Sequence, residues 1–153
     1  MRRSLLRCVA LMLVAAAAAP VALAADGLTA LTVVDLKVGT GALARDGMQV
    51  ELSYTGWLYD ASAPDHHGAR IDSSYDHGQT ITFTLGEGKV IAGWDKGIKG
   101  MHVGGKRTLL IPPRLGYRGR RVGKLVPPNA SLVFDVDPRP FHGVMPYRDG
   151  RMQ

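Results

Sequence analysis

The stretch VIAGWDKGIKG, residues 90–100, is the one segment whose apolar residues follow a helical rather than an alternating pattern. Ile91, Trp94 and Ile98 are spaced i, i+3 and i+7, which places them on one helical face. Gly100 is a natural helix stop. The two glycines inside the segment each lower helix propensity by about 1 kcal/mol. A helix here therefore needs packing against the rest of the chain.

Apolar and polar residues alternate on both sides of this segment, which is typical of strands with one face toward a core. The expected strands are 31–38, 49–55, 80–85, 106–111 and 131–136. Because strands precede and follow a single short helix, the class is α+β. We expect that helix to lie on an antiparallel sheet of about five strands.

Four stretches show no periodicity. Residues 39–47 contain Gly39 and Gly41, so we expect a loop there. Residues 61–69 are polar and interrupted by proline and glycine, so we expect an exposed loop. Residues 112–128 contain four prolines and three glycines in 17 positions. Loops of that length in a small domain are usually functional or disordered. Residues 138–153 are expected to form a C-terminal tail.

The first 24 residues have the composition of a secretory signal peptide. Three arginines within residues 1–7 precede an apolar run, and Ala22-Leu23-Ala24 offers small residues for cleavage. The apolar run is short for a bilayer span, which needs about 20 residues. We therefore expect cleavage after Ala24, no membrane anchor afterwards, and a folded domain over residues 25–137. The protein would be exported, to the periplasm of a Gram-negative cell or otherwise secreted.

Charge and residue types argue against several other chemistries. The mature part has 16 Lys and Arg against 13 Asp and Glu, a net charge of +3 that does not call for nucleic acid. The single cysteine, Cys8, lies in the expected signal peptide. The adjacent His66 and His67 are expected to be solvated, and no spacing typical of a metal site occurs. Gly86-Glu87-Gly88 lacks the Lys-Ser/Thr of a phosphate-binding loop and therefore indicates a turn. We thus expect neither a metal nor a cofactor.

Six motifs then occur in a fixed order between residues 31 and 136. They are Tyr54-Thr55-Gly56, Ile71-Asp72-Ser73-Ser74, Phe83-Thr84-Leu85-Gly86, Val90-Ile91-Ala92-Gly93-Trp94, Ile111-Pro112 and Leu132-Val133-Phe134-Asp135-Val136. No single motif is decisive. In this order and spacing they resemble the FKBP-type peptidyl-prolyl cis/trans isomerases.

The resemblance implies a twisted antiparallel half-barrel sheet around the short helix, with a substrate pocket between the two. Trp94 would be the floor of that pocket. Asp72 at its edge and Tyr117 above it would be the catalytic residues. The remaining substrate-binding residues would be Tyr54, Ile71, Ile81, Phe83, Val90, Ile91, Val126 and Phe134. The substrate would be oriented by the Ile91 amide and the Tyr117 hydroxyl.

Some positions depart from the family's pattern. Ile71 stands where the family most often has an aromatic residue, and Ile81 stands where the family often has another. His77 occupies a position that is often basic and supports Asp72. Arg118 replaces the glycine after the loop tyrosine, so a positive φ there would carry strain of about 1–3 kcal/mol.

Two functions follow as hypotheses. The first is a monomeric isomerase that acts on X-Pro bonds of exported proteins and binds FK506 or rapamycin. The second is a binding or chaperone module with the same fold and little turnover, which Ile71 and Arg118 favour. The clusters 106–107 and 118–121 are expected to be solvated, and the second, beside the pocket, could favour acidic substrates.

Overall fold

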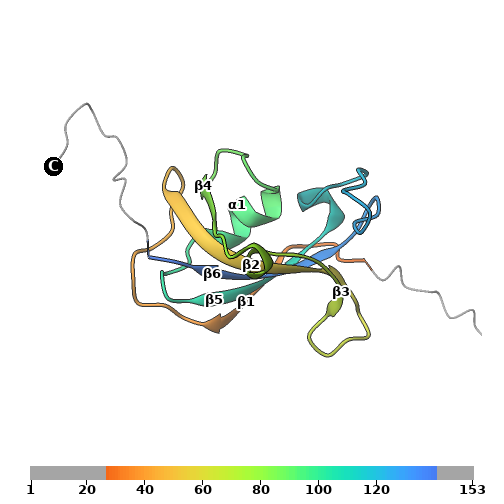
Figure 1. Cartoon of the computed structure of the whole chain (residues 1–153), viewed down its shortest axis with the longest axis horizontal. Helices are drawn as coiled ribbons and strands as arrows, with labels where there is room; N and C mark the ends of the chain where they lie inside the picture. Colours follow the sequence, from red (N-terminus) through yellow and green to blue (C-terminus); the bar gives the residue numbers. More distant parts are fainter. Residues whose placement is uncertain (1–26, 141–153) are drawn as a thin grey trace, which may run out of the picture.

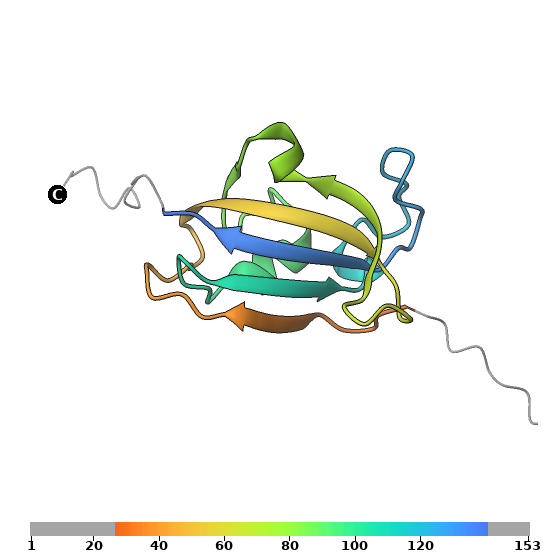
Figure 2. The same cartoon turned by 60° about the horizontal axis from the view of Figure 1, so that its bottom comes forward.

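The computed structural model describes residues 27–140, and these form an antiparallel sheet wrapped around one short helix (Figures 1 and 2). The strands are β1 (Thr32–Lys37), β2 (Gln49–Tyr59), β3 (His67–Ser73), β4 (Ile81–Thr84), β5 (Lys106–Ile111) and β6 (Leu132–Pro138). The helix α1 spans Ala92–Ile98, and short 3-10 turns η1 (Ser74–His77) and η2 (Pro113–Leu115) follow β3 and β5. The predicted α+β class is confirmed, with six strands in place of about five.

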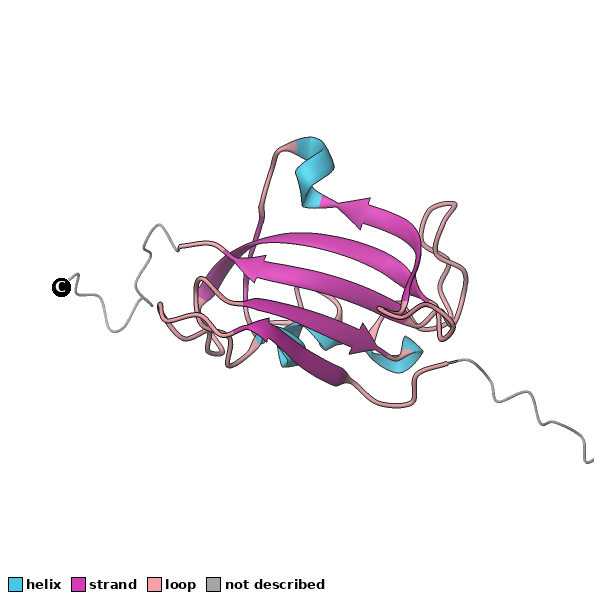
Figure 3. Ribbon diagram, turned by 90° about the horizontal axis from the view of Figure 1, so that it is seen from below, coloured by secondary structure: helices cyan, strands magenta, loops and turns pink. Residues whose placement is uncertain are grey.

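Strand β2 organises the sheet. The order is β1-β5-β6-β2-β3, and β4 pairs with the first part of β2 on the side where β3 pairs with its last part. At 11 residues β2 is long enough to serve both neighbours, and its pairing with β6 sets Gly56 opposite Phe134. The sheet curves around α1, which covers one of its faces in Figure 3. That concave face carries the core.

The expected helix forms where its pattern predicts it, with Ile91 as the residue just before its first turn. Trp94 and Ile98 are 5% and 0% exposed, so they form the buried face. A Cβ on Gly97 would lie 2.6 Å from Leu109 Cδ2 of β5, so the helix approaches β5 more closely than any larger residue allows. The helix-weakening glycines therefore permit the packing that stabilises the helix.

Strand β3 corrects the expectation of a loop through residue 69, because the strand already begins at His67. Its first residues lack apolar alternation, yet they pair with the end of β2, Trp57 with Arg70 and Tyr59 with His67. A Cβ on Gly68 would lie 2.7 Å from the Leu58 carbonyl oxygen, so glycine allows this close approach. The first residues of β3 are therefore a strand because their backbone pairs with β2, and not because of their own sequence pattern.

His67 is not simply solvated, which corrects a second expectation. Its ring stacks on Trp57 with centroids 3.8 Å apart and planes within 5°. Its Nδ1 lies 3.1 Å from Asp65 Oδ2, and its side chain is only 20% exposed. The outer face of β2 thus carries an aromatic pair well away from the helix.

Arg107 is also not a solvated residue. Its side chain is 12% exposed, and it donates from Nε and Nη2 to the two Asp35 carboxylate oxygens at 2.6 and 3.0 Å. Its Nη1 donates to the Gly97 carbonyl at 2.8 Å. This guanidinium lowers the pKa of Asp35. Arg107 therefore ties β1, β5 and the end of α1 together.

The ends of the domain differ in part from the sequence prediction. Pro138 belongs to β6, pairing with Leu52, and Arg139 N–H donates to the Glu51 carbonyl at 2.9 Å. The expected tail therefore begins later than residue 138. Its remainder, 141–153, and the expected signal peptide, 1–24, lie outside the described residues. Within residues 27–140 no helix has the length and apolarity to cross a membrane.

Candidate functional site

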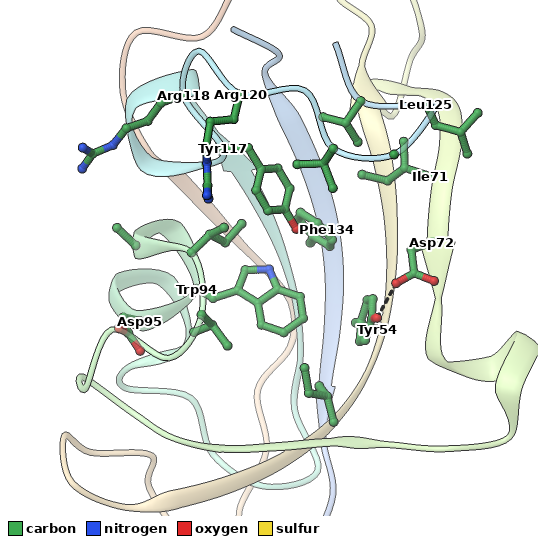
Figure 4. Close-up of a pocket in the computed structure, with 18 of the residues that line it drawn as sticks. Tyr54, Ile71, Asp72, Trp94, Asp95, Tyr117, Arg118, Arg120, Leu125 and Phe134 are labelled. Atoms are coloured by element: carbon green, nitrogen blue, oxygen red, sulfur yellow. Dashed lines mark hydrogen bonds between the residues drawn. The ribbon is translucent and has the colours of Figure 1, made fainter. Parts of the chain in front are cut away.

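A cleft of about 820 Å³ opens between α1, the concave face of β2 and β6, strand β3 and the loop 112–128 (Figure 4). Ten of the eleven residues expected at the site line it. These ten are Tyr54, Ile71, Asp72, Ile81, Val90, Ile91, Trp94, Tyr117, Val126 and Phe134. Six different parts of the chain thus contribute to one cavity.

The floor of the cleft is a packed aromatic cluster. The Trp94 ring meets Tyr54 and Phe134 edge to face, with centroids 5.0 and 5.2 Å apart. Such pairs are each worth about 0.5–1.5 kcal/mol beyond the area they bury. Phe83, expected as a wall, is not among the lining residues. Its ring packs 5.9 Å from that of Trp94, so it supports the floor.

The indole Nε1 of Trp94 is buried and has no hydrogen-bond partner. In Figure 4 this nitrogen is directed toward Tyr117. A buried donor without a partner costs about 1–3 kcal/mol and is uncommon in native structures. The floor therefore combines an apolar surface with one unused donor.

Asp72 lies at the edge of the cleft, where three groups approach its carboxylate. The Tyr54 hydroxyl donates to Oδ2 at 2.5 Å, and the Ser73 N–H donates to Oδ1 at 2.8 Å. His77 Nε2 lies 3.7 Å from Oδ1, so it forms an ion pair only when it is protonated. Burial, with the nearby Asp72 charge, strongly raises the pKa of Tyr54. Asp72 is thereby held in place chiefly by a neutral phenol.

Tyr117 leans over the cleft from the loop that follows η2. Burial raises its pKa, the Asp72 charge raises it further, and Arg120 opposes the change. Its hydroxyl is therefore near enough to both charged side chains to respond to them. The phenol remains a hydrogen-bond donor at neutral pH.

Arg118 has φ 56°, so the residue after Tyr117 does occupy the left-handed region. Two backbone hydrogen bonds maintain this geometry: Arg118 N–H donates to the Pro113 carbonyl at 3.0 Å, and Asn129 N–H donates to the Arg118 carbonyl at 2.7 Å. These hydrogen bonds, one from the Arg118 N–H and one to its carbonyl, hold the residue in the left-handed conformation. The condition under which the sequence predicted strain, a positive φ at Arg118, is therefore met.

Twelve lining residues were not among the expected site residues, although Arg118 and Arg120 belong to the basic cluster that was expected beside the pocket. The twelve are Gly88, Lys89, Ala92, Asp95, Arg114, Gly116, Arg118, Arg120, Val122, Gly123, Lys124 and Leu125. Most belong to the loop 112–128, whose residues show no periodicity that could place them. Asp95 fixes the predicted turn at 86–88, because its two oxygens accept the Gly86 and Gly88 N–H groups at 2.9 Å each.

The described residues contain no cluster of three or more His, Asp or Glu side chains that could hold a metal ion. The polar groups closest to the aromatic floor are instead the Asp72 carboxylate, two phenols and a helix-start amide, and basic side chains of the loop 112–128 lie at the rim. None forms a nucleophile–base pair with a neighbour. The arrangement can bind an uncharged, apolar group and hydrogen-bond to its periphery.

Comparison with known proteins identifies the family. The model for FKBP-type peptidyl-prolyl cis-trans isomerases matches residues 41–137. An FK506-binding protein of Neisseria meningitidis serogroup A is 45% identical over 107 residues, covering 70% of this chain and 92% of that protein. The peptidyl-prolyl cis-trans isomerase FPR2 of Saccharomyces cerevisiae is 48% identical over 94 residues, covering 61% of this chain and 65% of that protein.

Among solved structures, the crystal structure of AtFKBP13 superimposes with a TM-score of 0.62 at 38% identity, covering 72% of this chain and 92% of that one. The chain belongs to the family of FKBP-type peptidyl-prolyl cis-trans isomerases. It is therefore an enzyme of the isomerase class, and the sequence-based prediction of fold and activity is confirmed.

Proposed function

We propose that the cleft around Trp94 is the isomerase site, and that it accelerates X-Pro isomerisation by stabilising the twisted amide. One observation carries this proposal: ten of the eleven site residues that the family resemblance implied line a single cleft that has an aromatic floor and a polar edge. That convergence is independent of any one motif.

The chemistry of the bond explains why such a cleft suffices. Rotation about a peptide bond has a barrier of about 18–20 kcal/mol, because the nitrogen lone pair is delocalised into the carbonyl. In the twisted transition state that delocalisation is lost, so the amide becomes less polar. An apolar surface such as Trp94 with Phe134 then favours the twisted form over the hydrated planar one. This is differential transition-state binding and needs no nucleophile.

The polar groups of the cleft fit roles in orientation. The Tyr117 hydroxyl can donate to a substrate carbonyl oxygen, and the Ile91 amide opens α1 at the cleft wall. Asp72 would lie beside the carbonyl carbon of the twisting bond. The Tyr54 hydroxyl donates a hydrogen bond of 2.5 Å to its carboxylate and partly stabilises that charge. Substrates would be proline-containing segments, and FK506-like or rapamycin-like ligands would occupy the same cleft.

The cellular setting belongs to the same proposal. The basic start, apolar run and Ala22-Leu23-Ala24 of the N-terminus support export with removal of residues 1–24. Exported chains fold after crossing the membrane, and X-Pro isomerisation is among the slowest steps of folding. We therefore propose that the protein acts as a monomer on newly exported polypeptides, in the periplasm of a Gram-negative cell or otherwise outside the cell.

A second candidate is a binding or chaperone module that uses the same cleft with little turnover. Two observations favour it. Arg118 is strained beside Tyr117, and Ile71 gives an aliphatic wall beside Asp72. Either feature would lower catalysis more than binding. The two candidates differ in rate alone, so a kinetic measurement separates them.

The test is cis/trans exchange in an Ala-Leu-Pro-Phe peptide, followed by NMR exchange spectroscopy without a coupling protease. We expect catalysed exchange, with about tenfold losses in Asp72→Ala and Tyr117→Phe, the size of one lost hydrogen bond. Unfolding free energies should change by less than about 1 kcal/mol. Asp76→Ala and Tyr75→Phe are matched controls, since both residues are exposed and outside the cleft.

Three results would count against the proposal. Exchange no faster than in buffer, with peptide still bound, would favour the binding module. Equal losses of rate and stability in the Asp72 and Tyr117 variants would make those residues structural. Binding of peptide or of FK506 can be followed by Trp94 fluorescence in a Trp57→Phe background, and no change at saturating ligand would exclude the cleft as the site.

A further inference from the structure

The positive charge of the described domain is concentrated in the loop 112–128. Residues 27–140 contain fourteen Lys and Arg and eleven Asp and Glu. Five of the fourteen, and none of the eleven, lie in this loop. The rest of the domain is therefore slightly acidic, and the loop beside the cleft accounts for all of its positive balance. Such a local excess of one sign attracts the opposite charge.

The loop presents these charges on an ordered backbone. Leu115 and Val126 anchor it, with exposures of 8% and 4%. Val122 and Val126 exchange two backbone hydrogen bonds, of 3.0 and 3.2 Å, and close a small hairpin. The Arg120 N–H donates to the Tyr117 carbonyl at 3.2 Å, forming a tight turn. Arg120 is thus placed by the same turn that places Tyr117.

Three of the nine basic residues elsewhere in the described domain are paired with carboxylates. Arg70 pairs with Asp76, Lys99 with Asp46, and Arg107 with Asp35. Within residues 27–140, by contrast, no carboxylate lies within ion-pair distance of any of the loop's five basic residues. Their charge is available to a ligand.

Four basic residues of this loop line the cleft: Arg114, Arg118, Arg120 and Lys124. Of the two arginines labelled in Figure 4, Arg120 is the one that turns toward the floor. In Figure 4 its side chain descends beside Tyr117 toward the Trp94 floor, whereas that of Arg118 projects away. Its charge acts on the Tyr117 phenol and lowers its pKa against the larger effect of burial. Arg121, its neighbour, is exposed and does not line the cleft.

The two sides of the cleft therefore carry opposite charges. Asp72 lies across the floor from Arg120 in Figure 4, and Tyr117 responds to both. Asp95 also lines the cleft, but both of its oxygens accept backbone N–H groups from Gly86 and Gly88. A segment that crosses the floor would meet a free cation on one side and a carboxylate on the other.

We propose that Arg120 makes the enzyme prefer proline segments that carry a glutamate or aspartate on one side of the proline, within two residues of it. This inference rests on the proposed function, since it takes the Trp94 cleft as the substrate site. Arg120 would act as a specificity-determining residue, through a charge-assisted hydrogen bond to the substrate carboxylate. On the Asp72 side, an acidic residue would be disfavoured.

The expected preference is modest, because Arg120 is exposed. Exposed ion pairs typically shift an equilibrium by about two- to fivefold. Salt screens them, with a Debye length of about 3 Å at 1 M. Both the size of the preference and its salt dependence are therefore part of the inference.

The test uses acetylated, amidated peptides with one central proline, in which Glu or its neutral isostere Gln is placed in turn at each of the two positions before and the two positions after the proline. Leu or Ala precedes the proline in every peptide that does not carry Glu or Gln there. The measured quantity is the ratio of kcat/KM for the Glu and Gln peptides. We expect a ratio of about two to five on one side of the proline. It should approach one in Arg120→Gln and at 1 M NaCl, and persist in Arg121→Gln, the matched control that removes the same charge from the same loop.

Two outcomes overturn the inference. One is a ratio near one at all four positions. The other is an equal loss of preference in both arginine variants, which would assign the effect to the net charge of the loop. Failure of the proposed function is distinguishable, since then the neutral Ala-Leu-Pro-Phe peptide would show no catalysed exchange. Peptide affinity measured by calorimetry on the same set would still test the charge preference.

Discussion

The floor and the rim of the cleft are built in different ways. The floor consists of buried aromatic rings on α1 and β6, such as Trp94 and Phe134, which are 5% and 3% exposed. The rim consists of polar side chains on β3 and the loop 112–128, such as Asp72, Tyr117 and Arg120. The floor is part of the hydrophobic core, so its geometry follows from packing. The rim depends on turns and single hydrogen bonds, so its residues can change while the fold persists.

Trp94→Ala tests the floor and should have the largest effect. Truncating a buried tryptophan usually costs about 3–5 kcal/mol, and three aromatic neighbours would lose their contacts. We expect a loss of that size in the free energy of unfolding, measured by urea denaturation, together with loss of catalysed exchange. Trp94→Leu serves if the alanine variant does not fold.

Trp57→Ala is the matched control for that experiment. Trp57 is half-buried on the outer side of the sheet, where it stacks on His67. Its loss should cost less stability and leave exchange of the Ala-Leu-Pro-Phe peptide as in the wild type. Equal effects of the two tryptophan variants would contradict a separate role for the floor.

The inward orientation of the floor residues could be predicted from sequence because they obey a period, whereas their place in a pocket was implied by the family resemblance. Trp94 shares a helical face with Ile98, and Phe134 shares a strand face with Val136, so both must point inward. Periodicity predicts which face of an element a side chain points to, but not whether that side chain reaches the cleft or lies behind it. The family resemblance implied that Phe83 is part of the cleft wall, whereas it packs behind Trp94.

The rim could be predicted only through family resemblance, and only in part. Asp72 and Tyr117 were implied by the family resemblance, while Arg120 was known only as part of a basic cluster. Its orientation depends on a turn whose hydrogen bond joins two backbone groups. Strand β3 shows the same limit, since Gly68 and its neighbours form a strand by pairing with β2.

A second experiment tests the rim through the pH dependence of stability. The pKa of Tyr54 is raised in the folded protein by burial and by Asp72, from an ordinary value of 10.0. The unfolded chain therefore loses this proton at lower pH than the folded chain does. Stability contributed by the protonated phenol is intact below pH 10.0 and is lost as pH rises above it.

The free energy of unfolding should thus fall more steeply above that pH in the wild type than in Tyr54→Phe. One proton can contribute at most about 1.4 kcal/mol per pH unit, and the partial exposure of Tyr54 keeps the difference below that limit. Urea denaturation at a series of pH values measures it. The exposed Tyr75→Phe is the control, and a slope change equal in both variants would argue against the Tyr54–Asp72 contact.

Arg118→Gly should have the smallest effect, and it tests whether the rim is strained. A non-glycine residue in the left-handed region costs about 1–2 kcal/mol, partly offset by the greater freedom of glycine in the unfolded chain. We therefore expect a gain of about 0.5–1 kcal/mol in the free energy of unfolding. Arg118→Ala removes the same charge and keeps the Cβ, so it should show no gain.

The difference in unfolding free energy between the Arg118→Gly and Arg118→Ala variants separates the effect of backbone conformation from that of losing the arginine side chain. Asn129, also in the left-handed region with φ 59°, is a residue type that tolerates it, so the strain should be specific to position 118. If the glycine variant is more stable and also catalyses faster, the arginine limits how Tyr117 is held. If it is more stable at an unchanged rate, the closed backbone around Pro113 and Asn129 fixes Tyr117 by itself. No gain over the alanine variant would show that the left-handed conformation at residue 118 carries no strain.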